Sequence, residues 1–429
     1  MRFLSHFSMG IALATAGAVA VTALPTEAQA QKKKKQKKPK LSKEFAAQAG
    51  PIQKAIEGED PASAKPMVEA LVAQQWTGYD KFVSGQFAVS LGSKLKDQSL
   101  QELGLNAMVS SGHTPAEQLG QYTFFLGNFA YGAGRYAEAQ QRLQSAYDGG
   151  FRSNNIAALL AEAYFKENKN QLGLTALDRA IADKKAEGAA APEDWYRRGA
   201  GVALKGDVAG ASAAWTYKLV EAYPTGENWR AALSVYRDSA TPKLDNQQNL
   251  ELMRLMRKAD AMASERDYFE YADAAGPRRL PGEVVSVLEE GIAKGAVRAN
   301  TQYTKETIGL ARGSVNADKA SLPASERDAG KSANGKIALA TADAFLGYAD
   351  YQKAESMYQA AISKGGIDDN RAQVGLGIAK AGNKDWQGAK TAFAAVNGSR
   401  QPIANFWSLW IDQQSAPPAP AVTAAVTEN

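Results

Sequence analysis

A pattern of small and bulky residues that returns about every 34 positions is the feature of this sequence that most constrains its fold. In the clearest copy, Ala139, Leu143 and Ala146 stand at i, i+4 and i+7, which places them on one face of a helix. Further copies occupy the triplets Gly173, Leu177 and Ala180; Ala211, Trp215 and Lys218; Val284, Leu288 and Gly291; Ala354, Tyr358 and Ala361; and Ala389, Phe393 and Val396. Self-similarity of this kind predicts a repeat architecture.

A second small residue comes about twelve positions before most of these triplets, on a preceding apolar stretch. These residues are Gly127, Ala161, Gly199, Ala342 and Gly377. Two antiparallel helices explain both sets, because a small residue facing a small residue lets the backbones approach, and the bulky residue then fills the space beside them. One hairpin cannot bury its own apolar face, so neighbouring hairpins must stack. We therefore expect an all-α fold, an α-solenoid of stacked antiparallel helix hairpins.

These motifs resemble the tetratricopeptide-repeat (TPR) family, whose repeats carry Trp, Leu-Gly and Tyr on the first helix and Ala, Phe, Ala and Pro on the second. The residues that carry the resemblance are Leu126, Gly127, Tyr136, Ala139, Leu143 and Ala146; Trp195, Gly199, Ala211, Trp215 and Pro224; and Leu376, Gly377, Trp386, Ala389, Phe393 and Pro402. Lys218 departs from the pattern, and the Val284 copy is weak. The resemblance implies a right-handed superhelix that binds another protein or a peptide, without enzyme activity and without a cofactor.

The expected organisation has a signal peptide, two series of TPR-like repeats and four further segments. In chain order these are a cleavable signal peptide (1–30), a disordered Lys-rich arm (31–40), N-terminal helical hairpins (41–118), TPR-like repeats (119–312), a loop or hinge (313–335), C-terminal TPR-like repeats with a capping helix (336–412) and a disordered tail (413–429). The stretches 228–238 and 249–262 fill a gap between clear repeats, and we interpret them as one degenerate hairpin. Segment 313–335 is assigned to a loop because it lacks apolar periodicity.

The first thirty residues have the pattern of an export signal. Arg2 precedes an apolar run from Ile11 to Leu24, and small residues at Ala28 and Ala30 suit a signal peptidase. A membrane-spanning helix would need about 20 apolar residues, which is longer than this run. We expect cleavage near Ala30 and a periplasmic or secreted bacterial protein.

Lysines dominate the segment that follows, which contains no acidic residue. They include Lys32, Lys33, Lys34, Lys35, Lys37 and Lys38. From Leu41 onward the chain is nearly balanced, with 42 basic and 44 acidic residues. The arm either contacts an anionic membrane surface or serves as a spacer, and the balanced body gives no reason to expect nucleic acid as a partner.

Residues with catalytic or metal-binding chemistry are scarce. The chain has no cysteine and two histidines, of which only His113 lies outside the expected signal, so neither a metal site nor a Ser-His-Asp triad is expected. The phosphate-loop-like sequence at Gly330 lacks the required upstream glycine, and acid pairs such as Asp368-Asp369 suit helix starts. The aromatic sequence NFWSLWI (405–411) could form a binding platform, but capping of the last repeat is favoured.

The expected function is a non-catalytic scaffold in the cell envelope that binds a protein or peptide on the concave face of the solenoid. By resemblance to the family, the groove residues are Phe124, Asn128, Tyr131, Asn155, Glu162, Phe165 and Lys166. Some relatives hold a peptide carboxylate at such positions, but Glu162 replaces the residue that this activity requires. The alternatives are a structural accessory subunit of an envelope secretion or transport complex, and an enzyme or carbohydrate-binding protein of the cell wall.

Overall fold

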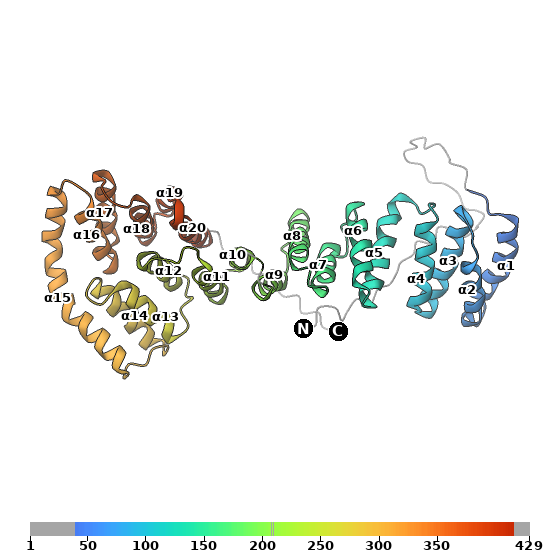
Figure 1. The fold of residues 1–429 in the computed structure, drawn as a ribbon, viewed down its shortest axis with the longest axis horizontal. Coiled ribbons are helices and arrows are strands. Elements are labelled where there is room, and N and C mark those ends of the chain that lie inside the picture. Colours follow the sequence, from blue (N-terminus) through green and yellow to red (C-terminus); the bar gives the residue numbers. More distant parts are fainter. Residues whose placement is uncertain (1–38, 207, 209, 416–429) are drawn as a thin grey trace, which may run out of the picture. The chain divides into compact units, whose positions relative to one another are not determined.

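The computed structural model describes residues 39–206, 208 and 210–415, and over these ranges every regular element is a helix (Figure 1). The expected signal peptide, the arm lysines Lys32–Lys38 and residues 416–429 lie outside the described residues. The chain divides between Ala191 and Pro192 into two compact units, called here the N-terminal and the C-terminal unit. None of the helices in the described ranges is long and apolar enough to span a membrane.

The N-terminal unit consists of short helices, each packed on its neighbours in sequence. They are α1 (Lys43–Glu57), η1 (Pro61–Ala64), α2 (Lys65–Ala73), α3 (Gly78–Leu95), α4 (Gln98–Ser110), α5 (Ala116–Gly132), α6 (Tyr136–Asp148), α7 (Ile156–Lys166) and α8 (Asn170–Ala186). Successive helices pair as hairpins, with α3 on α4, α5 on α6 and α7 on α8. The prediction of stacked helical hairpins is confirmed.

The packing inside these hairpins follows the repeat pattern. Ala139 and Leu143 of α6 are completely buried and Ala146 is 2% exposed. A Cβ atom on Gly127 of α5 would lie 2.8 Å from Cγ of Leu143, so α5 and α6 pack closely only because residue 127 has no side chain. The recurring small residues therefore mark the contact between the two helices of a hairpin.

The C-terminal unit continues the series of neighbouring helices. They are α9 (Glu193–Lys205), α10 (Ala211–Ala222), α11 (Gly226–Ser239), α12 (Asn246–Lys258), α13 (Glu265–Ala275), α14 (Pro281–Ala293), α15 (Gln302–Lys331), α16 (Lys336–Gly347), α17 (Tyr351–Lys364), α18 (Asp369–Gly382), α19 (Trp386–Ala394), η2 (Gly398–Arg400) and α20 (Gln401–Ser415). The repeat rule holds here too, since Gly199 faces the ring of Trp215 and Gly377 faces the ring of Phe393.

Helix α12 is the central helix of the C-terminal unit. Every residue from Leu250 to Met256 is buried, although this stretch includes Glu251 and Arg254. A helix buried on all sides has no exposed face that must be polar, so the usual repeat pattern is lost. This explains why the stretch 249–262 departs from the pattern of the other repeats.

The last helix closes the C-terminal unit on itself, because α20 packs on α12 in the interior of this unit (Figure 1). Trp407 is 1% exposed, and its Nε1 donates to the backbone oxygen of Glu251 over 3.2 Å. Phe406 lies among the rings of Tyr217, Trp229 and Tyr236. The favoured capping role of 405–411 agrees with this burial, and a sugar- or peptide-binding platform at these rings is excluded because they are covered by other helices.

The prediction of a loop or hinge at 313–335 is wrong, because most of this segment belongs to the long helix α15. Its Ala, Lys, Glu and Arg residues are good helix formers even without an apolar stripe. Contacts from α16 and α17 hold the helix in place, including Tyr348 Oη to Asp318 at 2.7 Å and Lys353 Nζ to Glu326 at 3.0 Å. The division between units lies instead before Pro192. The expected tail also starts too early, since Gln413 belongs to α20 and bonds Trp229.

Candidate partner-binding site

Two of the predicted groove residues in the N-terminal unit are buried between helices, and they line neither of the two clefts described below. Phe124 is 2% exposed and its ring lies 5.3 Å from that of Phe151. Phe165 is 8% exposed and covers Gly173, where a Cβ atom would clash with the phenyl ring. Both rings fill spaces between helices, so the prediction is wrong for these two residues.

The other predicted groove residues reach the surface to different degrees. Asn155 and Lys166, at the two ends of α7, are exposed. Asn128, Tyr131 and Glu162 are partly exposed. The ring of Tyr131 lies 5.5 Å from that of Tyr136 in an edge-to-face arrangement. A binding role for these five residues stays a prediction.

The predicted groove residues lie at fixed spacings from the small residue of each first helix, Gly127 or Ala161, and we call this spacing the groove register. Applied to the C-terminal unit, the groove register leads to a cleft on α13. Counted from the buried Ala272, the equivalent positions are Arg266, Phe269 and Asp273. All three line a cleft of 470 Å³ that Asn246 and Asn249 of α12 complete. Its remaining lining residues are Glu265, Glu270 and Ala274.

The acidic side chains of the α13 cleft already have partners. Glu265 pairs with Arg298, and Glu270 pairs with Arg237 at 2.8 Å. Asp273 accepts a hydrogen bond from Tyr303, whose ring lies 4.4 Å from that of Phe269. The acidic charges of this cleft are therefore compensated within the protein, and we place the principal site in a second cleft.

A second cleft, of 390 Å³, lies between the first helices of the last two repeats, α16 and α18. The register identifies Lys336 and Leu339 from Ala342, and Arg371 from Gly377, and all three line the cleft. The other lining residues are Ala340, Gly366, Ile367 and Asp368. The sequence therefore contains a signal for this cleft, namely the spacing from Ala342 and Gly377, whereas the groove residues predicted above belong to α5 and α7 or lie next to them.

The α16–α18 cleft combines apolar and basic groups. Leu339 is buried beneath the cleft, whereas Ala340 and Lys336 are exposed. Among the described residues Lys336 makes no ion pair, so its ammonium group is available to an anionic or carbonyl group of a ligand. Arg371 donates from Nη2 to the carboxylate of Asp343, and its buried Nε has no hydrogen-bond partner within the described ranges.

A buried polar network fixes Arg371 from behind. Tyr358 Oη donates to Asp343 over 2.5 Å, and burial followed by the charge of Asp343 raises the pKa of Tyr358 well above its usual value. Tyr358 therefore stays protonated and remains a donor at neutral pH. Asp343 accepts hydrogen bonds from both Tyr358 and Arg371. This arrangement preorganises the basic side of the cleft.

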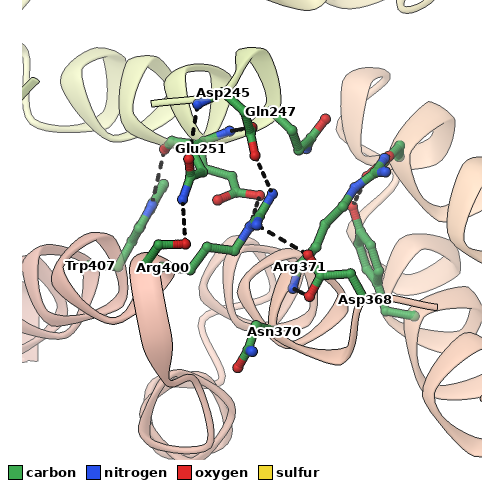
Figure 2. A network of polar contacts seen from close by, with 12 residues as sticks. Asp245, Gln247, Glu251, Asp368, Asn370, Arg371, Arg400 and Trp407 are labelled. Atoms are coloured by element: carbon green, nitrogen blue, oxygen red, sulfur yellow. Dashed lines mark hydrogen bonds and ion pairs between the residues drawn. The ribbon is translucent and has the colours of Figure 1, made fainter. Parts of the chain in front are cut away.

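Arg400 connects the cleft to the closure of the unit. Its guanidinium contacts Asp368 Oδ2 at 3.1 Å, Glu251 Oε1 at 3.4 Å and Asp245 Oδ2 at 3.4 Å (Figure 2). Asp368 also caps α18 by accepting from the backbone nitrogen of Arg371 over 3.2 Å. The side chain of Asp368, at the edge of the cleft, is therefore bonded both to α18 and to Arg400 of η2.

His113 is exposed, and its Nδ1 lies 3.1 Å from the backbone oxygen of Ser111. In residues 39–206, 208 and 210–415, no group of three or more histidine, aspartate or glutamate side chains is arranged to hold a metal ion. The α16–α18 cleft offers an apolar floor, an ammonium group and a guanidinium group.

No protein-family model matches the sequence, and no curated protein matches it. Among solved structures, the crystal structure of yeast Tom70 is similar over 87% of this chain and 96% of its own length, with 10% sequence identity and a TM-score of 0.22. At that TM-score the likeness carries no argument about this chain. The assignment to a TPR-like helical repeat depends on the helices and packing described above.

Proposed function

We propose that this protein is a non-catalytic scaffold of the bacterial cell envelope, and that it binds a segment of another protein in the α16–α18 cleft. The observation that carries the proposal is the position of this cleft: first-helix groove positions of two successive repeats line it, and they bring Lys336, Arg371 and Leu339 together. An extended segment would bury an apolar side chain against Leu339 and place a polar or anionic group between the two basic side chains.

The envelope location and the role of the arm belong to the same proposal. The export-like pattern of residues 1–30 supports a periplasmic or secreted protein, and Lys32–Lys38 offer charge for an anionic membrane surface. A structural accessory subunit of an envelope secretion or transport complex would use the same partner-binding cleft. For a cell-wall enzyme or carbohydrate-binding protein, the Trp407 and Trp410 rings offer no binding platform, because both are buried.

Site-specific photocrosslinking in the native cell tests this function. A photoreactive residue at Ala340, which is exposed in the cleft, should attach to a defined partner, whereas one at the exposed Ala320 of α15 should not. With the partner purified, Lys336→Glu should weaken binding by roughly tenfold, because it reverses the available charge of the cleft. The matched variant Lys305→Glu reverses an exposed charge on α15 and should leave the affinity unchanged.

Equal losses of affinity in Lys336→Glu and Lys305→Glu would show that general electrostatic attraction, and not this cleft, holds the partner. Unchanged affinity in both variants would place the binding site elsewhere on the protein.

A further inference from the structure

The closure of the C-terminal unit depends on contacts between segments far apart in the chain. Besides the bond from Trp407 to Glu251, Gln248 Nε2 of α12 donates to Ser399 Oγ of η2 over 3.0 Å. Gln413 of α20 donates to the backbone oxygen of Val220 over 2.9 Å. These bonds join α20 and η2 to α10 and α12, and the two that α20 makes must break whenever α20 leaves the interior.

A carboxyl group lies in this interface with little compensation. Glu251 is 1% exposed, and its only described ion pair is the 3.4 Å contact of Oε1 with Nε of Arg400. Its other oxygen, Oε2, is buried and has no hydrogen-bond partner within the described part of the chain. Arg400 is shared with Asp245 and Asp368, so three carboxylates compete for one guanidinium (Figure 2). A negative charge on Glu251 is therefore poorly stabilised when the interface is closed.

The charged and titratable groups that act on Glu251 come from several elements of the C-terminal unit. Arg254 belongs to α12 and Asp245 is the N-cap residue of this helix, whereas Arg400 comes from η2, Asp343 from α16 and Tyr236 from α11. Burial raises the pKa of Glu251 to about 7, against the opposing charges of Arg400 and Arg254, and Asp343 adds to the increase. This group accordingly changes its charge near neutral pH.

We propose that Glu251 is a proton-controlled latch: the neutral carboxyl favours α20 packed on α12, and ionisation of the carboxyl loosens that contact. When α20 leaves, Glu251 meets water, where its charge is well solvated, so the open form releases the proton more readily than the closed form. Closure is therefore strongest at low pH and weakens as the pH rises through neutrality. Because Arg400 also bonds Asp368, loosening of the latch reaches the edge of the α16–α18 cleft.

Hydrogen exchange of the full-length protein measures the latch without any partner, so the result is independent of the proposed function. After correction for the intrinsic exchange rate, protection of the α20 amides should fall on the order of 50-fold between pH 5 and pH 8. Glu251→Gln keeps the shape of the neutral side chain, and its α20 amides should stay protected across this range. The matched variant Asp245→Asn removes another partner of Arg400 and keeps a helix cap, and it should retain the fall seen in the wild type.

Two results would overturn the latch. An equal fall of protection in Glu251→Gln and the wild type would assign the pH dependence to another group. Loss of α20 protection at both pH 5 and pH 8 in a folded Glu251→Gln protein would show that the ionised pair with Arg400 holds the closure.

Arg400→Gln provides an independent test, which also serves if Glu251→Gln does not fold. Removal of the guanidinium takes away the largest charge that lowers the pKa of Glu251, so the fall of α20 protection should move to higher pH. A midpoint that stays in place would contradict the assignment to Glu251.

Discussion

The pKa values of two buried glutamates of the C-terminal unit are shifted in opposite directions, and the number of hydrogen bonds that each carboxylate receives explains the difference. Glu283 of α14 receives two 2.7 Å bonds from Arg254 and a third from Tyr271 Oη at 2.7 Å. Burial alone would raise the pKa of Glu283, but the charge and bonds of Arg254 outweigh it and hold the pKa below its ordinary value. Glu251 has a single longer contact with Arg400. Burial next to arginine therefore does not by itself keep a carboxyl ionised.

Replacement of Glu283 tests this account at a single residue. Glu283→Gln should lower the free energy of unfolding at pH 7 by about 3 kcal/mol, because Arg254 is left buried without a counter-charge. The folded-state pKa of Glu283 lies below the unfolded value of 4.5, so its stabilisation is present above pH 4.5 and is lost as the pH falls through the folded-state pKa. Urea unfolding should therefore show a smaller difference from the wild type at pH 3.5 than at pH 7.

The control for this prediction is Glu289→Gln, which removes an exposed partner of Arg312. Exposed ion pairs contribute little, so the expected change is less than about 1 kcal/mol. If Glu283→Gln were as mild as this control, the buried bidentate pair would not be a main support of the C-terminal unit.

At the scale of the helix, the small residues of the repeat matter because they have no bulky side chain and so leave room for the neighbouring helix. A Cβ atom on Gly377 of α18 would lie 2.6 Å from Cε1 and Cζ of Phe393, so Gly377→Ala should destabilise the protein by about 1–3 kcal/mol through overpacking. The same substitution at Gly309, in α15 of the same unit, meets no atom within 4 Å. Gly309→Ala should stabilise the protein by up to about 1 kcal/mol, because alanine is the better helix former.

Thermal unfolding compares the two alanine variants directly, and shifts of opposite sign are expected. Destabilisation by both would mean that glycine is required in α15 for a reason other than packing. Stabilisation by both would mean that α18 and α19 do not pack closely at Gly377.

The repeat pattern predicted helices well where each contact is local and less well elsewhere. The triplet Ala354, Tyr358 and Ala361 is completely buried, as the spacing required. The pattern failed for Phe124 and Phe165, because the family position indicates a groove while the neighbouring aromatic or glycine residue decides whether the ring is covered. It failed for α15 because a helix held by polar contacts along its length needs no apolar stripe.

At the scale of the whole molecule, contacts between distant segments could not be predicted from periodicity. The bonds from α20 to α12 join Trp407 to Glu251, and those from η2 join Arg400 to Asp245. Periodicity reports which face of a helix is buried, but it does not identify the helix that covers this face. The α16–α18 cleft, in contrast, lies between neighbouring repeats, and the spacing of groove positions along the sequence is sufficient to identify several of its lining residues.

The closure of the C-terminal unit leads to a prediction about Trp407, the largest of the fully buried side chains of α20. Its ring stacks on that of Phe393 at 5.9 Å, and its Nε1 bonds α12. Trp407→Ala should lower the free energy of unfolding of this unit by about 3–5 kcal/mol, since it leaves a cavity. Trp407→Phe keeps most of the ring contact and loses the hydrogen bond, so a smaller loss of about 1–2 kcal/mol is expected. Hydrogen exchange resolved along the chain should place the faster exchange within 192–415 and leave 39–191 unchanged. Equal acceleration in both units would mean that α20 supports the whole chain, whereas no acceleration would mean that the unit stays closed without Trp407.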